Sequence, residues 1–263
     1  LNEYKGMPSY FRTHPLTTER IAEMADRAEH LPGVMYGENS VNSIEYRIMK
    51  AKVTAESGSP NEAVKLFRTM LEDQTVVRPK ENLYGLAFAL RRAHDFEGAW
   101  KTLQPIRANG SHPAFELLAG QILVDMHHND EAIAVYRAAL KDNPGYRALT
   151  YACLDQMLQE GRAKDVLGEL DDRLRRRSDD WRLYDLQARA FAAEGRPIGE
   201  HRAQAESYYR RNNLPAAVDQ LELAVKQTKG GDFYEMSIAE SRLRELRVQL
   251  ENERAAEKAL KIS

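Results

Sequence analysis

The chain has 263 residues, with 38 Lys and Arg against 40 Asp and Glu, and so a formal net charge of −2. This balance argues against a nucleic-acid scaffold, which needs a dominant basic field. Hydrophobic residues make up 43% of the chain, enough for a core, and 15 glycines with 10 prolines disfavour a many-turned all-β fold. The single cysteine, Cys153, excludes a disulfide within the chain. No apolar stretch reaches the roughly 20 residues of a membrane-spanning helix, so we expect no membrane insertion.

The first 32 residues are predicted to form a loop followed by a helix. The loop ends at Pro15, Thr17 is placed to cap the helix, and Glu19 falls in the first turn, where an acidic side chain is favourable. The apolar face of this helix is formed by Ile21, Met24 and Ala28. The chain starts at Leu1 rather than Met and shows no secretory signal, so we expect it to be a fragment of a longer protein.

A pattern of paired helices recurs along residues 33–229. In the clearest copy, residues 115–144, the small Ala132 lies where two helices cross, Tyr136 and Ala139 fill the next layer, and a proline ends the unit. The copy resembles the tetratricopeptide (TPR) repeat. The positions equivalent to Ala132 are spaced 36, 33, 34 and 51 residues apart, and the first three intervals match the 34-residue TPR period. These positions are Ala63, Ala99, Ala132, Val166 and Ala217.

The last interval equals one and a half repeats, and it predicts an extra helix at Trp181–Glu194. After the break at Gly230-Gly231, residues 233–260 read as one long helix with a single apolar stripe. Such a helix suits the end of a helical stack, with a coiled coil as the alternative. The stripe is formed by Ile238, Leu243, Leu246 and Leu250.

The sequence therefore predicts an all-α fold, a TPR-type α-solenoid of antiparallel helix pairs with a C-terminal capping helix. An irregular all-α bundle is the alternative. The expected divisions are residues 1–32, the TPR repeats at 33–229 and the capping helix at 230–263.

The N-terminal segment also resembles a known family. Thr13-His14-Pro15 followed by Glu19-Arg20-Ile21 is similar to the last motif of the catalytic domain in HEXXH zinc metallopeptidases of the BepA/YfgC type, in which TPR repeats follow that domain. The resemblance implies that residues 1–32 are the tail of a catalytic domain, that His14 lies at the zinc cleft of the intact parent, and that Arg20 is a structural anchor. It places the zinc-binding H-E-x-x-H upstream of Leu1.

The resemblance further implies a periplasmic location. It implies recruitment of outer-membrane assembly machinery or misfolded outer-membrane proteins. The chain itself has no H-E-x-x-H, G-x-S-x-G, Walker or dinucleotide-binding motif, so we expect no catalysis, metal or cofactor in these 263 residues.

Binding to a protein or peptide is the function that the repeats favour, in a groove lined by the first helix of each pair. Three aromatic candidates, Tyr84, Phe88 and Tyr151, would act as anchors, or would instead pack between repeats. Three cationic candidates would pair with partner carboxylates. The full set of groove candidates is Lys52, Tyr84, Phe88, Arg91, Gln121, Asp125, Tyr151, Asp155 and Arg189.

Two local clusters have alternative interpretations. His127 and His128, with the acidic residues that follow, form an exposed polar turn or a metal site. The basic run Arg173–Arg177, flanked by aspartates, is a solvated helix end or a patch for an anion or nucleic acid. For the whole chain, the alternatives to the protease module are a stand-alone TPR adaptor unrelated to any protease and an enzyme with an unrecognised site.

Overall fold

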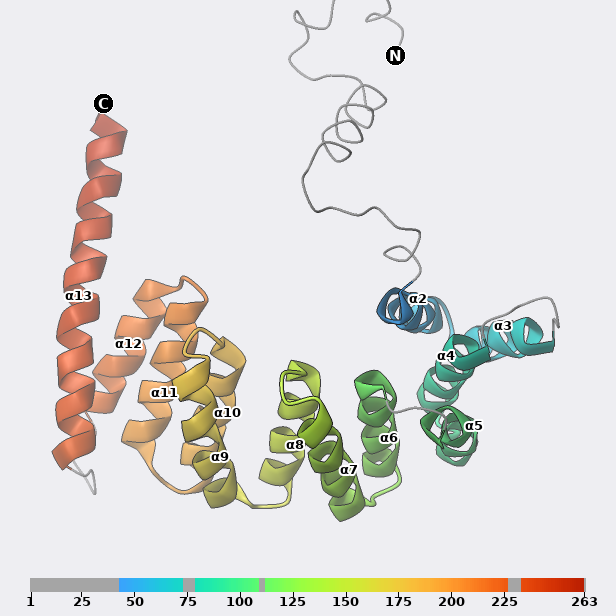
Figure 1. The fold of residues 1–263 in the computed structure, drawn as a ribbon. Helices are drawn as coiled ribbons and strands as arrows, with labels where there is room; N and C mark the ends of the chain where they lie inside the picture. Colours follow the sequence, from blue (N-terminus) through green and yellow to red (C-terminus); the bar gives the residue numbers. More distant parts are fainter. Residues whose placement is uncertain (1–42, 73–78, 109–111, 227–232, 263) are drawn as a thin grey trace, which may run out of the picture.

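The computed structural model describes residues 43–72, 79–108, 112–226 and 233–262. These residues form twelve α-helices and no strand, which confirms the predicted all-α fold. The helices form an elongated row from α13 at one end to α3 at the other, with α2 packed beside α4 (Figure 1). Their bounds are α2 Ile44–Glu56, α3 Pro60–Glu72, α4 Pro79–Arg92, α5 Phe96–Ala108, α6 Pro113–Asp125, α7 Asn129–Asp142, α8 Arg147–Gln159, α9 Ala163–Arg176, α10 Trp181–Ala193, α11 Pro197–Arg210, α12 Leu214–Val225 and α13 Phe233–Ile262.

The helices alternate with a regular period. Helices α6, α8 and α10 begin at Pro113, Arg147 and Trp181, which are 34 residues apart, and α4 and α12 extend this series to within one residue. We call α2, α4, α6, α8, α10 and α12 the A helices, and α3, α5, α7, α9, α11 and α13 the B helices. The described residues thus form six A–B pairs stacked as a solenoid, the arrangement of TPR-type repeats.

The structure corrects the predicted register in the fifth repeat. Trp181–Glu194 is not an extra half unit, because α10 is the A helix of a regular pair with α11. Ala217, taken as a B-helix position, lies on the A helix α12. The true equivalent of Ala132 in α11 is Glu200, five residues after a left-handed turn residue in both cases. Ala217 matches the sequence pattern because it also lies five residues after a left-handed turn residue, Asn212, although that turn joins α11 to α12.

One turn geometry joins the two helices of four pairs, α4–α5, α6–α7, α8–α9 and α10–α11. A residue with positive φ ends the A helix, and the next amide donates to a carbonyl one turn back, as in His128 N to Leu123 O at 2.8 Å and Arg162 N to Met157 O at 2.9 Å. This is the Schellman arrangement, which satisfies the last carbonyls of a helix. The positive-φ residues of these turns are His94, His127, Gly161 and Gly195. Asn212 makes the same turn between α11 and α12, and Gly58 has a positive φ between α2 and α3.

Close approach of neighbouring helices depends on glycine at two positions. Gly120 on α6 faces the ring of Tyr136 on α7, and a Cβ at this position would lie 2.1 Å from a ring carbon. Gly85 on α4 faces the ring of Phe67 on α3 in the same way, at 2.3 Å. Each aromatic ring is almost fully buried and fills the space that the missing side chain leaves.

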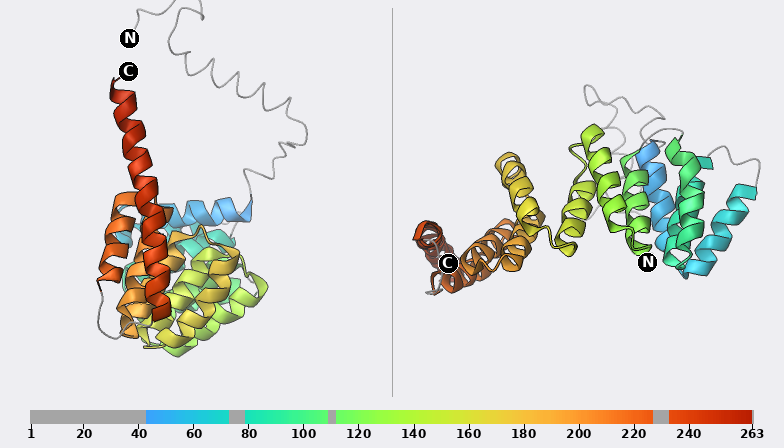
Figure 2. Two further views of the ribbon diagram at one scale, coloured as in Figure 1. Left: turned by 90° about the vertical axis from the view of Figure 1, so that its left-hand side faces the viewer. Right: turned by 90° about the horizontal axis from the view of Figure 1, so that it is seen from below.

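Helix α13 closes the row, as predicted for the capping helix. It buries Ala239, Leu243 and Leu246, while α12 and α11 pack against it. Arg242 on the same helix is half-buried and forms an ion pair with Glu206 of α11 at 2.7 Å. The C-terminal end of α13 projects beyond the stack (Figure 2).

Helix α6 has a histidine as its N-cap, and this makes stability depend on pH. Nδ1 of His112 accepts a hydrogen bond from the amide of Ala114 at 3.2 Å. Burial lowers the pKa of His112, although the Glu45 carboxylate, 4.0 Å from Nε2, opposes the shift. The folded protein thus takes up the proton less readily than the unfolded chain. The contribution of His112 to the free energy of unfolding is therefore fully present above the unfolded pKa of about 6.5. It declines as the pH falls below that value.

We expect the variant His112→Ser to isolate this effect, because serine caps the helix without titrating. The difference in Tm, wild type minus variant, should fall as the pH is lowered from about 7.5 to about 5.5. Thermal unfolding of both proteins in matched buffers measures it. A difference that stays constant over this range would contradict the assignment.

Candidate functional site

Three ion pairs join neighbouring A helices of the stack. Each connects residues 34 positions apart, and thus the same position in two successive repeats. The pairs are Arg47–Glu81, Arg91–Asp125 and Asp155–Arg189. We call the surface around these pairs the A-helix face. Glu81 is buried, whereas Asp155 and Arg189 keep 39% and 53% of their side-chain area exposed.

Each cation that was predicted to meet a partner carboxylate already has an acidic neighbour in the chain. Arg91 pairs with Asp125, and its Nη1 also donates to the side-chain oxygen of Gln121 at 3.4 Å. Lys52 lies 3.8 Å from Glu56. Arg189 pairs with Asp155. A bound acidic segment would therefore compete with these internal carboxylates.

Two of the three predicted aromatic anchors are buried. Tyr84 is 4% exposed and Phe88 is 8% exposed, and their ring centroids lie 6.3 Å apart. Tyr84 also contacts the ring of Phe115 on α6, with centroids 5.7 Å apart, and burial raises its pKa. The Lys52 ammonium lies 5.9 Å from the centre of the Phe88 ring. This geometry fits the alternative in which the aromatics pack between repeats.

The third aromatic, Tyr151, belongs to a separate site. Its hydroxyl donates to Asp180 Oδ2 at 2.6 Å and accepts from Arg147 Nε at 2.8 Å. Asp180 is only 3% exposed, and its other oxygen caps α10 by accepting from the amide of Arg182 at 3.2 Å. Burial and the hydrogen bond to Asp180 together raise the pKa of Tyr151. Tyr151 is thus held by polar contacts with Asp180 and Arg147, whereas Tyr84 and Phe88 are held by packing.

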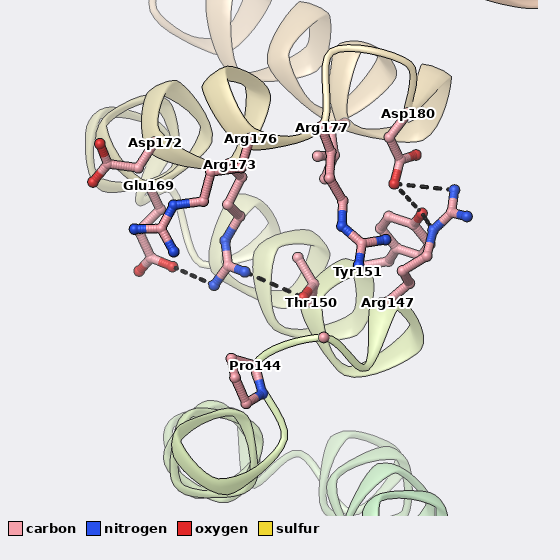
Figure 3. A pocket seen from close by; sticks show the side chains of 12 residues that line it. Pro144, Arg147, Thr150, Tyr151, Glu169, Asp172, Arg173, Arg176, Arg177 and Asp180 are labelled. Atoms are coloured by element: carbon pink, nitrogen blue, oxygen red, sulfur yellow. Dashed lines mark hydrogen bonds and ion pairs between the residues drawn. The ribbon is translucent and has the colours of Figure 1, made fainter.

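Tyr151 lines a cavity of about 330 Å³ between α8 and α9, which we call the α8–α9 pocket (Figure 3). The connections before α8 and after α9 complete its walls. Inside it, Arg173 Nη1 donates to the buried Thr150 hydroxyl at 3.3 Å, and the Arg173 guanidinium lies 3.7 Å from Glu169. The lining residues are Pro144, Gly145, Arg147, Thr150, Tyr151, Glu169, Asp172, Arg173, Arg176, Arg177, Asp180 and Leu183.

Sequence reasoning missed Thr150 as a member of this pocket. The sequence did carry one signal, the basic run Arg173–Arg177 with its flanking aspartates. Three arginines of the run line the cavity, and so do the flanking Asp172 and Asp180. The contact between Asp180 and Tyr151 was not predictable, because it spans 29 positions and depends on how α8 meets the start of α10.

The metal alternative for the histidine turn gains no support. His127 and His128 are exposed, and His128 Nδ1 lies 2.9 Å from Glu131. Among the described residues, no three His, Cys, Asp or Glu side chains gather to hold a metal ion. Cys153 is 1% exposed, and burial raises its pKa to about 11, so its thiol stays protonated near neutral pH. His14 and Arg20 lie outside the described residues.

None of the described helices combines the length and the apolar character needed to cross a bilayer. No protein-family model matches the sequence, and no curated protein matches it significantly. Among solved structures, the chain is similar to one described as a MamA RS-1 ArsTM double mutant, with a TM-score of 0.45 and 16% identity over 72% of this chain and 97% of that one. It is also similar to TTC0263, described as a thermophilic TPR protein in Thermus thermophilus, with a TM-score of 0.40 and 18% identity over 76% of this chain and 98% of that one.

Proposed function

We propose that this chain is a TPR-type interaction module that binds a segment of a partner protein along its A helices. The observation that supports this most directly is the register of the A-helix face, where side chains 34 positions apart meet across successive repeats. Stacked helix pairs create extended surfaces of this kind, and repeat proteins use them to bind other chains. The half-exposed Asp155 and Arg189 offer both charges to a partner on this face.

We further propose that the module is the C-terminal region of a BepA/YfgC-type zinc metallopeptidase in the periplasm. There it would recruit outer-membrane assembly partners or misfolded outer-membrane proteins. The support is Thr13-His14-Pro15 with Glu19-Arg20-Ile21, placed directly before the repeats in the sequence. In this proposal the zinc ligands lie in a catalytic domain that precedes the repeats, and the repeats recruit partners without taking part in catalysis.

Testing binding on the A-helix face first requires a partner segment. To obtain one, proteins captured on the immobilised chain are identified, overlapping peptides of each are synthesised, and the binding of each peptide is measured by calorimetry. We expect one peptide to bind saturably to the wild type and at least about fivefold more weakly to Arg189→Ala, since a charged contact is worth about 1 kcal/mol or more.

The matched control is Arg175→Ala, an exposed arginine on α9 that pairs with a neighbouring aspartate. It should bind the peptide as the wild type does. If no defined segment binds saturably, or if both variants weaken binding equally, the A-helix face is not the binding surface.

The protease part of the proposal has a separate test. The coding sequence upstream of Leu1 is determined, and the longer protein is assayed for bound zinc and for peptidase activity. An H-E-x-x-H with stoichiometric zinc supports the proposal. If no H-E-x-x-H motif is found, the stand-alone TPR adaptor is the better interpretation. Peptide turnover by the 263 residues alone would contradict a non-catalytic module.

A further inference from the structure

Within the described part of the chain, the α8–α9 pocket holds two arginines whose guanidinium groups have no ion pair or hydrogen bond. These are Arg176 and Arg177, and both are exposed. Of the other two arginines that line the pocket, Arg147 pairs with Asp180 at 3.1 Å, and Arg173 is held by Glu169 and Thr150. Figure 3 shows Arg177 directed toward Tyr151. The pocket therefore presents unused donors beside side chains that are already fixed.

The charge of the lining suits a single negative group. Four arginines face three acidic side chains, which leaves one net positive charge. One carboxylate from a ligand neutralises that charge. A nucleic acid would bring a row of phosphates against Glu169, Asp172 and Asp180, and the chain as a whole carries a net charge of −2. The local balance thus favours a carboxylate over a polyanion.

The size and the apolar part of the pocket favour a peptide. Its volume of about 330 Å³ is at the small end of the range of about 300–1,000 Å³ seen for ligand sites. The Tyr151 ring, Pro144 and the buried Leu183 supply apolar walls, and the guanidinium of Arg182 lies 5.4 Å from the Tyr151 ring centre. In an extended segment, an acidic residue next to an apolar residue would match both the arginine donors and the apolar walls of the pocket.

The walls around these donors are also positioned in advance. The buried Asp180 fixes Tyr151 and Arg147 from one side, and Thr150 holds Arg173 from the other. Side chains held in this way lose little conformational freedom when a ligand arrives. Arginine forms paired hydrogen bonds with carboxylates, and clusters of arginine are a recurrent means of binding acidic motifs.

We propose that the α8–α9 pocket binds the carboxylate of an acidic residue in an extended segment of a partner protein, with Arg176 and Arg177 as the donors. This inference rests on the proposed interaction function and adds a second contact, at the edge formed by α8 and α9. It assigns the chemistry of one position in the partner segment: an aspartate or glutamate next to an apolar side chain.

The test uses fluorescein-labelled peptides in which glutamate and leucine alternate, measured by polarisation against the full chain. Three further probes are the peptide with glutamine in place of glutamate, the peptide with phosphoserine, and a short single-stranded oligonucleotide. We expect the glutamate peptide to bind at least tenfold more tightly than the glutamine peptide. The double variant Arg176→Gln/Arg177→Gln should lose at least tenfold in affinity for the glutamate peptide.

Arg175→Gln is the matched control, since Arg175 lies on the same helix end but does not line the pocket. It should change the affinity by less than twofold, and all three proteins should share one Tm because the replaced side chains are exposed. Equal losses in Arg175→Gln and the double variant would overturn the proposal in favour of a general positive field. Tighter binding of the phosphoserine peptide or the oligonucleotide would overturn it in favour of a phosphate ligand. If the glutamate peptide does not bind, while a partner peptide still binds in a way that depends on Arg189, the pocket proposal is wrong and the proposed binding on the A-helix face stands.

Discussion

Asp180→Ala is expected to lower the free energy of unfolding by about 2–4 kcal/mol, a large effect for one exchange outside the apolar core. The carboxylate caps α10, accepts the Tyr151 hydroxyl and pairs with Arg147, all from a side chain that is 3% exposed. Loss of an N-cap costs about 0.5–2 kcal/mol, and hydrogen bonds to a charged group contribute about 1.5–3 kcal/mol. Urea unfolding followed by circular dichroism measures the change.

Two variants separate the contributions at this position. Asp180→Asn keeps an oxygen for the α10 cap but removes the charge, so we expect a smaller loss than for alanine. Asp172→Ala removes an exposed aspartate that pairs with Arg175 on the surface, and it should shift stability by no more than about 0.5 kcal/mol. A loss in Asp180→Ala as small as in Asp172→Ala would show that Asp180 does not hold α8 and α10 together.

Gly120→Ala should destabilise the stack by about 1–3 kcal/mol, although alanine is the better helix former. The added methyl group would lie 2.1 Å from the Tyr136 ring, which is 2% exposed and has no room to move away. The cost should be local to α6 and α7, because repeat arrays gain their stability from nearest-neighbour contacts. Hydrogen exchange of the amides in these two helices, together with urea unfolding, measures it.

Gly168→Ala is the matched control. Gly168 lies on α9 and has no atom within 4 Å of an added Cβ, so the same exchange should stabilise the protein by up to about 1 kcal/mol. Combining Gly120→Ala with Tyr136→Leu should recover part of the loss, since the ring that blocks the methyl group is gone. Equal effects at the two glycines would mean that helix propensity alone decides the outcome.

The solenoid was predictable because small residues at helix crossings recur with the period of the repeat. Ala63, Ala99, Ala132 and Val166 all lie buried on B helices, as predicted. The register failed at Ala217 because this alanine follows the left-handed Asn212 by five positions, as Ala132 follows His127, although Asn212 joins α11 to α12. The true B-helix position holds Glu200, and the sequence pattern does not distinguish the two kinds of helix. The left-handed residues were themselves hard to predict, since His94 and His127 occupy positions where glycine was the obvious signal.

The binding residues were less predictable than the fold. Tyr84 and Tyr151 occupy A helices and look alike in sequence, but one is buried against Phe115 and the other faces a pocket and bonds to Asp180. That difference comes from the residues that the following repeat places beside each tyrosine, Phe115 for Tyr84 and Asp180 for Tyr151, which no local pattern encodes. The same holds for Arg189, whose carboxylate partner lies 34 positions away.

The ion pairs at 34-residue spacing have a consequence for how the stack bends. Each pair joins one A helix only to the next, and the three pairs stabilise three different contacts: α2 with α4, α4 with α6, and α8 with α10. Because repeat arrays depend on nearest-neighbour contacts, loss of one pair is expected to increase bending at that one contact and to leave the other two unchanged.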